Sequence, residues 1–395
     1  MSSLSQIAAV SAMNIRSLPQ RVGTSSVVVI GIAGVVAVLI SVLAMSTGLL
    51  KTMQRTGPEN RAIVVRTGAS AELTSVLTNE ATHAIADSAG IKKDTEGHPL
   101  ASPEGVLIVN VIKKDGEEAV APFRGFTQEA FAVHPEIKLL QGRRFQPAVT
   151  ELIVGKAAQR LYKGLDVGSH VTLKGTTWTV VGTFESGGNA RESELIADAQ
   201  TLNSAYRRGN GAQSVLVILD SAASFQTFKD SITSNPQLQV DVATEKDFGT
   251  QQSDRISKIL KIVAYVVGGI MAVGAIFGAL NTTYSAVSAR SREIATLRAI
   301  GFGPTPVVVS IFVEALLLAL IGGTIGAVIA WLLFNGHSVD TSGGGFSGQL
   351  IFDLTVTPAL VALGIVWACV IGVIGGLFPA IRAARLPVAT ALRAI

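Results

Sequence analysis

Four long uncharged runs constrain this chain more than any other feature. They cover residues 22–50, 262–289, 299–339 and 354–381, and Glu314 is the only charged residue inside them. About 20 apolar residues suffice to cross a bilayer as a helix, because each residue adds 1.5 Å of length. Only 15% of all residues are charged, against about 25% in soluble proteins. The chain is therefore expected to span a membrane four times.

The segment between the first two runs has the composition of a water-soluble domain. Residues 51–258 contain 23 Lys and Arg and 24 Asp and Glu, so this segment is almost neutral. Short apolar stretches such as 62–66, 106–112 and 214–219 predict strands, and 78–89 and 224–234 predict helices. We expect a mixed α+β domain, inserted after the first membrane helix.

The placement of Lys and Arg predicts the orientation. Loops on the cytoplasmic side of a membrane are enriched in these residues. The segment 335–355 has no Lys or Arg. In contrast, basic residues precede the first run, separate the second from the third and follow the fourth: Arg16, Arg21, Arg290, Arg292, Arg298, Arg382, Arg385 and Arg393. Both termini are then cytoplasmic, and the α+β domain is extracytoplasmic. The remaining surplus of basic residues flanks the membrane and gives no indication of nucleic-acid binding.

These observations give a complete division of the chain. We expect a cytoplasmic amphipathic segment at 1–21, a cytoplasmic helix at 285–304 and a cytoplasmic tail at 380–395. The four membrane helices are expected at 22–50, 259–284, 305–334 and 356–379. The outer domain with its stalk occupies 51–258, and an outer loop occupies 335–355. The stalk is 254–262, whose helical pattern continues into the second span. A disordered tail at 1–21 and a flexible linker in place of the stalk are the alternatives.

No residue pattern predicts a catalytic, cofactor-binding or metal site. A phosphate-binding loop requires G-x-x-x-x-G-K-[ST], but Gly155-Lys156 is the only Gly-Lys pair and Ala157 follows it. A G-x-G-x-x-G match at 343–348 has no strand–helix context, and the histidines lack the spacing of metal ligands. Cys369 is the single cysteine. We interpret the acidic residues of the outer domain as ordinary solvated surface.

Two features inside the spans point to helix contacts. Glu314 requires a polar partner or cavity, since a carboxylate among lipid tails is costly. It is either a transport-path or conformational-switch residue, or a residue that makes a structural hydrogen bond near the cytoplasmic end, with Asn281 or Thr282 as candidate partners. Three G-x-x-x-G pairs permit close helix packing, within one chain or across a homodimer: Gly274 and Gly278, Gly322 and Gly326, Gly372 and Gly376.

The stretch between the second and third spans carries the most specific pattern. Residues 289–303 predict a short helix on which Ile294, Leu297 and Ile300 share one face, and Gly301 ends it. Such a helix suits docking into a partner's groove. A helix lying on anionic lipid is the alternative. Charged Arg292, Glu293 and Arg298 complete the candidate coupling residues.

Several motifs resemble the MacB/FtsX-type family of ABC permeases. Ser-Arg-Glu-Ile-Ala-Thr-Leu-Arg-Ala-Ile-Gly at 291–301 resembles the family's segment between spans two and three. Val-Glu-Ala-Leu at 313–316 is similar to its third span, and Phe-Pro-Ala-Ile-Arg-Ala-Ala-Arg-Leu at 378–386 to its C-terminal signature. Ile-Val-Gly-Lys-Ala-Ala at 153–158 and Trp-Thr-Val-Val-Gly-Thr-Phe at 178–184 resemble its periplasmic core domain.

The resemblance implies a non-catalytic subunit of an ATP-driven machine. Members bind two copies of an ABC ATPase, which holds ATP and Mg, and act as homodimers or with a homologous permease. The helix at 291–301 would be the coupling helix. Some members also work with a membrane-fusion protein and an outer-membrane channel. With no ATPase motif in this sequence, ATP hydrolysis is expected in a partner, and membrane lipid is the other contact.

Three functions remain open. The first is a permease of the cell (inner) membrane that exports or extracts a substrate across or from the cell envelope. The second is mechanical regulation of a periplasmic partner such as a cell-wall hydrolase, without transport. The third, an enzyme in the outer domain, is the least supported by the residues.

Overall fold

The chain forms two compact units. The computed structural model describes residues 3–17, 19, 22–55, 57–340 and 351–385. The first unit comprises 1–47, 258–337 and 354–395, and the second comprises 48–257 and 338–353. The chain therefore crosses between the two units four times.

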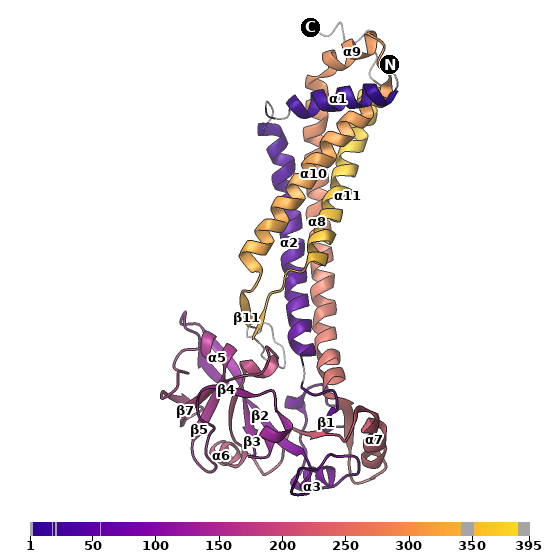
Figure 1. The fold of residues 1–395 in the computed structure, drawn as a ribbon. Helices are drawn as coiled ribbons and strands as arrows, with labels where there is room; N and C mark the ends of the chain where they lie inside the picture. The colour runs from indigo at the N-terminus through magenta and orange to yellow at the C-terminus, as the bar shows by residue number, and fades with distance from the viewer. Residues whose placement is uncertain (1–2, 18, 20–21, 56, 341–350, 386–395) are drawn as a thin grey trace. The chain divides into compact units, whose positions relative to one another are not determined.

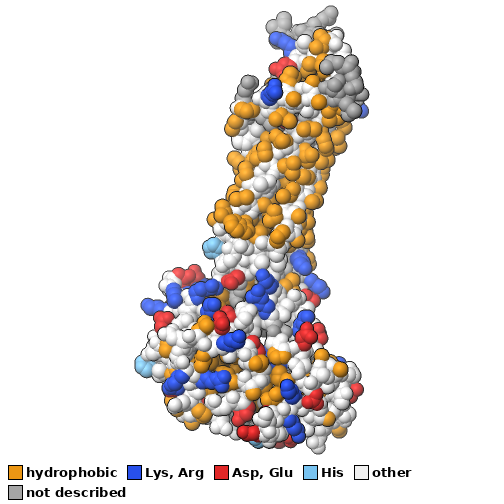
Figure 2. Space-filling model, in the orientation of Figure 1, with side chains coloured by type: hydrophobic (Ala, Val, Ile, Leu, Met, Phe, Trp, Pro, Cys, Tyr) orange, Lys and Arg blue, Asp and Glu red, His pale blue; other side chains and the backbone are white. Residues whose placement is uncertain are grey.

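The first unit is a helical bundle. Within the described part of the chain, four helices are long and apolar enough to cross a membrane: α2 (Val22–Gln54), α8 (Glu245–Ala289), α10 (Pro304–Phe334) and α11 (Pro358–Ala384). Figure 2 shows mostly hydrophobic side chains over these helices. Two shorter helices are α1 (Ser3–Ser17) and α9 (Ser291–Ala299). Each of the four predicted spans thus coincides with a long apolar helix, and the predicted stalk at 254–262 lies inside the continuous α8.

Glycines on α10 bring it close to α2. A Cβ atom on Gly322 would lie 2.8 Å from the backbone oxygen of Val29, and one on Gly326 would lie 2.4 Å from that of Ala33. Neither distance accommodates a methyl group, so these glycines allow the two helices to pack closely.

The glycines of α11 and α8 differ from each other. Cβ atoms on Gly372 and Gly376 would lie 2.5 Å from the Cβ atoms of Ala319 and Ala315 on α10. In contrast, nothing lies within 4 Å of a Cβ atom on Gly274 or Gly278 of α8. The α10 and α11 pairs therefore serve packing within the chain, whereas the α8 pair faces open space.

The second unit is a mixed α/β domain built on one ten-stranded sheet (Figure 1). Its strand order is β10-β1-β9-β2-β3-β8-β5-β7-β4, and β6 also pairs with β7. The strands are β1 (Arg61–Arg66), β2 (Ala101–Ile112), β3 (Glu118–Phe126), β4 (Lys138–Gly142), β5 (Glu151–Gly155), β6 (His170–Leu173), β7 (Thr176–Glu185), β8 (Leu195–Asp198), β9 (Ser214–Ile218) and β10 (Val240–Thr244). Only β3–β8 and β5–β7 are parallel. The predicted mixed α/β domain after the first long helix is confirmed.

Short helices cover the sheet. They are η2 (Glu72–Thr74), α3 (Asn79–Ala86), α4 (Ala130–Val133), α5 (Lys156–Leu161), η3 (Ala190–Ser193), α6 (Ala199–Ala205), η4 (Ala222–Ser224) and α7 (Phe225–Thr233). The largest buried side chain is Trp178, whose ring contacts Phe123 edge to face at 4.9 Å and whose Nε1 donates to the Tyr206 hydroxyl at 3.1 Å. Burying an indole in this way requires such a partner for its N–H group.

The domain has two lobes that share strand β2. Residues Ala101–Glu104 of β2 pair with β9, whereas Gly105–Ile112 pair with β3. The first lobe contains β1, β9, β10, α3 and α7 around one apolar core. The second contains β3 to β8 with α5 and α6 around another. A single strand therefore belongs to two separate cores.

The segment predicted as an outer loop, 335–355, contributes to the second unit. Its described ends form the antiparallel strands β11 (Ser338–Asp340) and β12 (Ile351–Asp353). Ser193 Oγ donates to the Ile351 carbonyl at 3.2 Å and accepts from the Ile351 N–H at 2.9 Å. Ile351 is buried in the second-lobe core. The segment predicted as an outer loop thus contains two short strands and adds a buried side chain to the second lobe.

Candidate functional site

The helix predicted to couple to a partner is α9, which is shorter than the predicted segment 285–304. Helix α8 extends to Ala289, and Arg290 connects it to α9 with a non-helical backbone. At the other end, Gly301 adopts a φ of +99° and the N–H of Phe302 bonds the Leu297 carbonyl at 3.1 Å. This left-handed glycine ends the helix, as the sequence predicted.

Part of the apolar face predicted for α9 is buried inside the helical bundle, and part of it is exposed. Ile294 and Ala295 are buried, and Ile294 packs in a small core with Ile311 of α10 and Ala380 of α11. Ile300 is 69% exposed. The expectation that Ile294 and Ile300 share a docking face is therefore wrong, because Ile294 already packs within the bundle.

The residues that α9 does present are mostly polar. Arg292, Glu293, Thr296, Ala299 and Ile300 are exposed. By contrast, Arg298 is half-buried and donates to the Ala384 carbonyl of α11 at 3.1 Å, and Leu297 is half-buried. A docking surface on α9 thus combines one large apolar side chain with charges of both signs.

Glu314 lies in a buried polar cluster at the start of α9. Its Oε2 atom is 3.3 Å from Nη1 of Arg290, and the two side chains are 14% and 9% exposed. The ion pair provides the polar partner that a carboxylate in an apolar helix requires. The sequence suggested Asn281 or Thr282 for this role and did not indicate Arg290.

Helix α1 completes this cluster. Arg290 Nη1 donates to Asn14 Oδ1 at 3.2 Å, and Arg290 Nη2 donates to Ser17 Oγ. Asn14 Nδ2 in turn donates to Ser310 Oγ of α10 at 2.9 Å. We name Arg290, Glu314, Asn14, Ser17 and Ser310 the Arg290 cluster. It joins α1, the α8–α9 connection and α10 by side-chain hydrogen bonds.

A small cavity of about 50 Å³ adjoins the Arg290 cluster. Its wall includes Glu293 and Leu297 of α9, together with Arg290 and Glu314. Arg290 Nε is buried there and has no hydrogen-bond partner. A buried donor without a partner is costly, so Arg290 is held here at some expense in stability.

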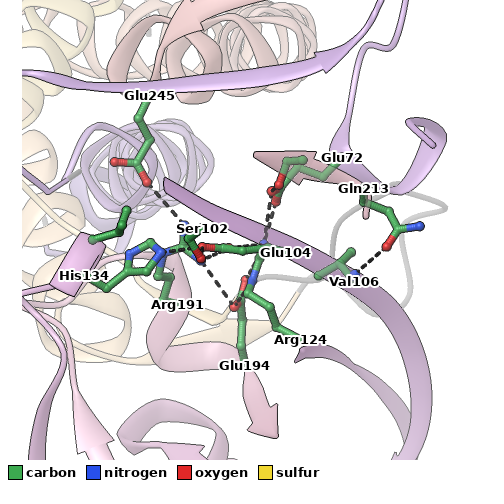
Figure 3. A network of polar contacts seen from close by, with 12 residues as sticks. Glu72, Ser102, Glu104, Val106, Arg124, His134, Arg191, Glu194, Gln213 and Glu245 are labelled. Atoms are coloured by element: carbon green, nitrogen blue, oxygen red, sulfur yellow. Dashed lines mark hydrogen bonds and ion pairs between the residues drawn. The ribbon is translucent and has the colours of Figure 1, made fainter. Parts of the chain in front are cut away.

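A second set of charges lies buried in the α/β domain (Figure 3). Glu104 has no exposed side-chain surface, and its two oxygens contact His134 Nε2 at 2.5 Å and Arg124 Nη1 at 3.0 Å. Arg124 also binds Glu72 at 2.8 Å and Glu194 at 2.7 Å. Burial of these groups is tolerated because each charge is paired and hydrogen-bonded.

The network continues to the first residue of α8. Glu245 binds Nη2 of Arg61 at 2.6 Å and Nη2 of Arg191 at 3.4 Å. Arg61, which is fully buried, also binds Glu136 at 2.9 Å. We name the set Arg61, Glu72, Glu104, Arg124, His134, Glu136, Arg191, Glu194 and Glu245 the ion network.

The cations keep the network carboxylates ionised. Burial alone would raise the pKa of Glu104, but His134 and Arg191 lower it well below its ordinary range. Burial also opposes the ionised form of Glu136, yet hydrogen bonds from His134 and Arg61 lower its pKa to about 2. The pKa of Glu72 is lowered as well, because Arg124 outweighs its burial. Glu72, Glu104 and Glu136 are therefore ionised at neutral pH.

The interpretation of the acidic residues as solvated surface is wrong for this network. The sequence contained one usable signal: Arg61 directly precedes the apolar strand segment predicted at 62–66, and half of the positions in such a strand face a core. No predicted residue belongs to the network. Among the described residues, no group of three His, Cys, Asp or Glu could hold a metal ion, and the G-x-G-x-x-G match at 343–348 lies outside the described residues.

Two family models together cover most of the chain. Residues 25–235 match the MacB-like periplasmic core domain, and residues 265–388 match the C-terminal part of FtsX-like permeases. The first match covers more than half of the chain, and its range includes all of β1 to β9.

Individual relatives are more distant. The chain is 27% identical over 195 residues to the ABC transporter permease YtrF of Bacillus subtilis (strain 168), covering 48% of this chain and 44% of YtrF. It is 33% identical over 133 residues to the macrolide export ATP-binding/permease protein MacB of Shewanella sp. (strain W3-18-1), covering 34% of this chain and 18% of MacB. The aligned part thus spans less than half of either relative.

A solved structure was also matched. The periplasmic region of MacB from Actinobacillus actinomycetemcomitans covers 54% of this chain and 97% of its own, with 14% identity and a TM-score of 0.37.

Proposed function

Because the chain belongs to the MacB/FtsX-type family of ABC transporter permeases, we propose that it couples ATP hydrolysis in a separate ATPase to movement of its α/β domain. The result would be export or extraction of a substrate across or from the cell envelope. The chain itself is a multi-pass membrane protein. We propose that the chain has no catalytic activity of its own and that the ATPase holds ATP and Mg.

The observation that carries this proposal is the attachment of α9. The helix presents Arg292, Glu293 and Ile300 outward, while Ile294 packs against α10 and α11. A force applied to the exposed face would therefore pass directly into two long helices. Arg290, immediately before α9, adds a third connection to α1 through Asn14.

The orientation and the partners belong to the same proposal. The basic residues that flank the spans support cytoplasmic termini, a cytoplasmic α9 and an extracytoplasmic α/β domain in the inner membrane. Two ATPase copies would bind two permease chains, either a homodimer or a pair with a homologous permease. The open face of α8 at Gly274 and Gly278 is compatible with such pairing or with lipid.

Affinity purification from native membranes, followed by mass spectrometry, tests the proposal. An ABC ATPase is expected to co-purify, and its turnover should depend on the permease. A membrane-fusion protein and an outer-membrane channel in the same sample would support export. A cell-wall hydrolase would instead support the alternative, mechanical regulation without transport. Recovery of the intact chain with no ATPase would contradict both.

A further inference from the structure

The two lobes of the α/β domain meet where strand β2 changes partner. The Gln213 N–H donates to the Glu104 carbonyl at 2.8 Å, which ends the pairing of β2 with β9. Two residues later, the Val106 N–H donates to Gln213 Oε1, also at 2.8 Å. A side chain thus replaces the β2–β9 ladder at this point, and β2 continues into the second lobe paired with β3.

The ion network lies at the same junction. Arg124 of β3, in the second lobe, binds Glu72 of η2, which adjoins the first lobe, with Ser214 of β9 also bonded to Glu72 at 2.6 Å. Arg191 of η3 binds Glu245, which follows directly after β10 of the first lobe. Glu104 lies at the change of partner and binds both Arg124 and Arg191.

Apolar packing between the lobes is incomplete. A cavity of about 140 Å³ lies beside the network, with Ile63 and Leu73 of the first lobe and Ile108 and Pro122 of the second in its wall. Helix α4 provides one apolar bridge, since Val133 packs in a first-lobe core and neighbouring residues pack in the second. Because this hollow opens to solvent, its apolar walls do not pack against one another across the junction.

The charges of the network do not balance. Five carboxylates (Glu72, Glu104, Glu136, Glu194 and Glu245) face three guanidiniums (Arg61, Arg124 and Arg191) and His134. The carboxylates therefore outnumber the guanidiniums by two. Each guanidinium must hold several carboxylates, and loss of one contact leaves a buried charge uncompensated.

We propose that the α/β domain is hinged at Glu104–Gly105 and that the ion network is the lock that holds its lobes closed. The hinge follows from the change of strand partner within β2. The lock follows from the paired charges that cross the junction beside an unfilled cavity. Opening separates Arg124 from Glu72 and Arg191 from Glu245, and it widens the cavity. The inference concerns the domain itself and holds whether or not an ATPase drives it.

Distance measurements between spin labels test this hinge in the full-length chain in lipid nanodiscs. Cys369→Ser removes the native thiol. Labels on Thr233→Cys and Gln141→Cys, both exposed positions, report the distance between lobes. A second pair on Lys114→Cys and Gln141→Cys reports a distance within the second lobe.

The decisive variant is Glu104→Gln, which keeps the shape of the side chain and removes its charge. The interlobe distances should lengthen and broaden by several ångströms, while the intralobe distances stay unchanged. Glu151→Gln is the matched control, because this buried carboxylate pairs with Arg143 inside the second lobe. It should leave the interlobe distances as in the unmodified chain.

An interlobe distribution that Glu104→Gln leaves unchanged would show one rigid body and overturn the proposal. If Glu104→Gln also alters the intralobe distances, Glu72→Gln replaces it under the same criteria. Glu72 is partly exposed (19%) and contacts Arg124 from the other lobe, so its loss weakens the lock with less cost to either core.

Discussion

Arg290 and Glu314 form an ion pair across 24 positions of sequence, with 3.3 Å between Nη1 and Oε2. One residue immediately precedes α9, and the other lies inside the apolar helix α10. Because both side chains are largely buried, the position of α9 and that of α10 are linked by a charge as well as by apolar packing.

Replacing Glu314 with Gln should destabilise the permease. It leaves the Arg290 guanidinium buried without a countercharge, at an expected cost of about 3 kcal/mol. The double variant Arg290→Met/Glu314→Leu should recover most of this loss, since no buried charge remains. Unfolding of the single and double variants in detergent measures the coupling. Equal stability of Glu314→Gln and the unmodified chain would show that the pair contributes nothing.

Ile294 of α9 and Ile300, which directly follows α9, should respond differently to substitution by Asp. Ile300→Asp places a charge on an exposed residue and should leave folding intact while reducing ATPase binding by tenfold or more. Ile294→Asp buries a charge in the core with Ile311 and Ala380 and should destabilise the permease itself. Pull-down and thermal unfolding of both variants separate the two effects. Full ATPase binding by Ile300→Asp would remove that residue from the docking surface.

Two glycines form a matched pair for helix packing. Gly326→Ala puts a methyl group 2.4 Å from the Ala33 backbone oxygen and should cost about 1–3 kcal/mol through overpacking. Gly274→Ala meets no atom within 4 Å and should raise stability by roughly 0.5–1 kcal/mol through helix propensity.

The Gly274 variant also reports on dimerisation. Unchanged dimer content, measured by light scattering, would place any homodimer contact away from Gly274. A shift toward monomers would place the seam there, although the packing prediction for Gly326 would stand.

The ion network predicts acid sensitivity of the α/β domain. Glu136, which has a pKa of about 2 in the folded chain, stabilises the folded state at pH values above its unfolded pKa. This contribution is lost as pH falls through about 2, so stability should decline progressively below about pH 5. From an ordinary value of 4.5 to about 2, the contribution at neutral pH is about 3 kcal/mol.

Thermal unfolding between pH 7 and pH 3 checks this slope. Glu136→Gln should flatten it, because that side chain no longer exchanges a proton, whereas Glu96→Gln, at an exposed position, should leave it unchanged. An unfolding temperature that is constant over this range would contradict the role of the network.

Long sequence patterns predicted the fold well. The four helices follow from runs of apolar residues that have few alternatives, and strands such as β1 and β9 follow from dense β-branched segments. Strand β4 was missed because all five of its residues are exposed, so no alternation marks it. Strand β3 was missed because Pro122 and Gly125 interrupt its pattern and are unfavourable in strands.

The site was predictable only in part. The α9 segment has a recognisable motif, and Gly301 marks its end. The partner of Glu314 was not predictable, because Arg290 lies 24 positions away and reads as an orientation signal. Pairings such as Arg124 with Glu194, 70 positions apart, arise from the order of strands in the sheet. The order of strands in a sheet cannot be predicted from the residues next to each strand.

The place of Ile351 in the second-lobe core has a consequence for how the protein is made. During synthesis, residues 48–257 emerge first, and Ile351 follows only after all of α10 has been translated. Until then the core lacks one of its buried side chains, and Ser193 lacks its backbone partner. The core of the second lobe is therefore completed only by a residue that is translated after the whole of α10.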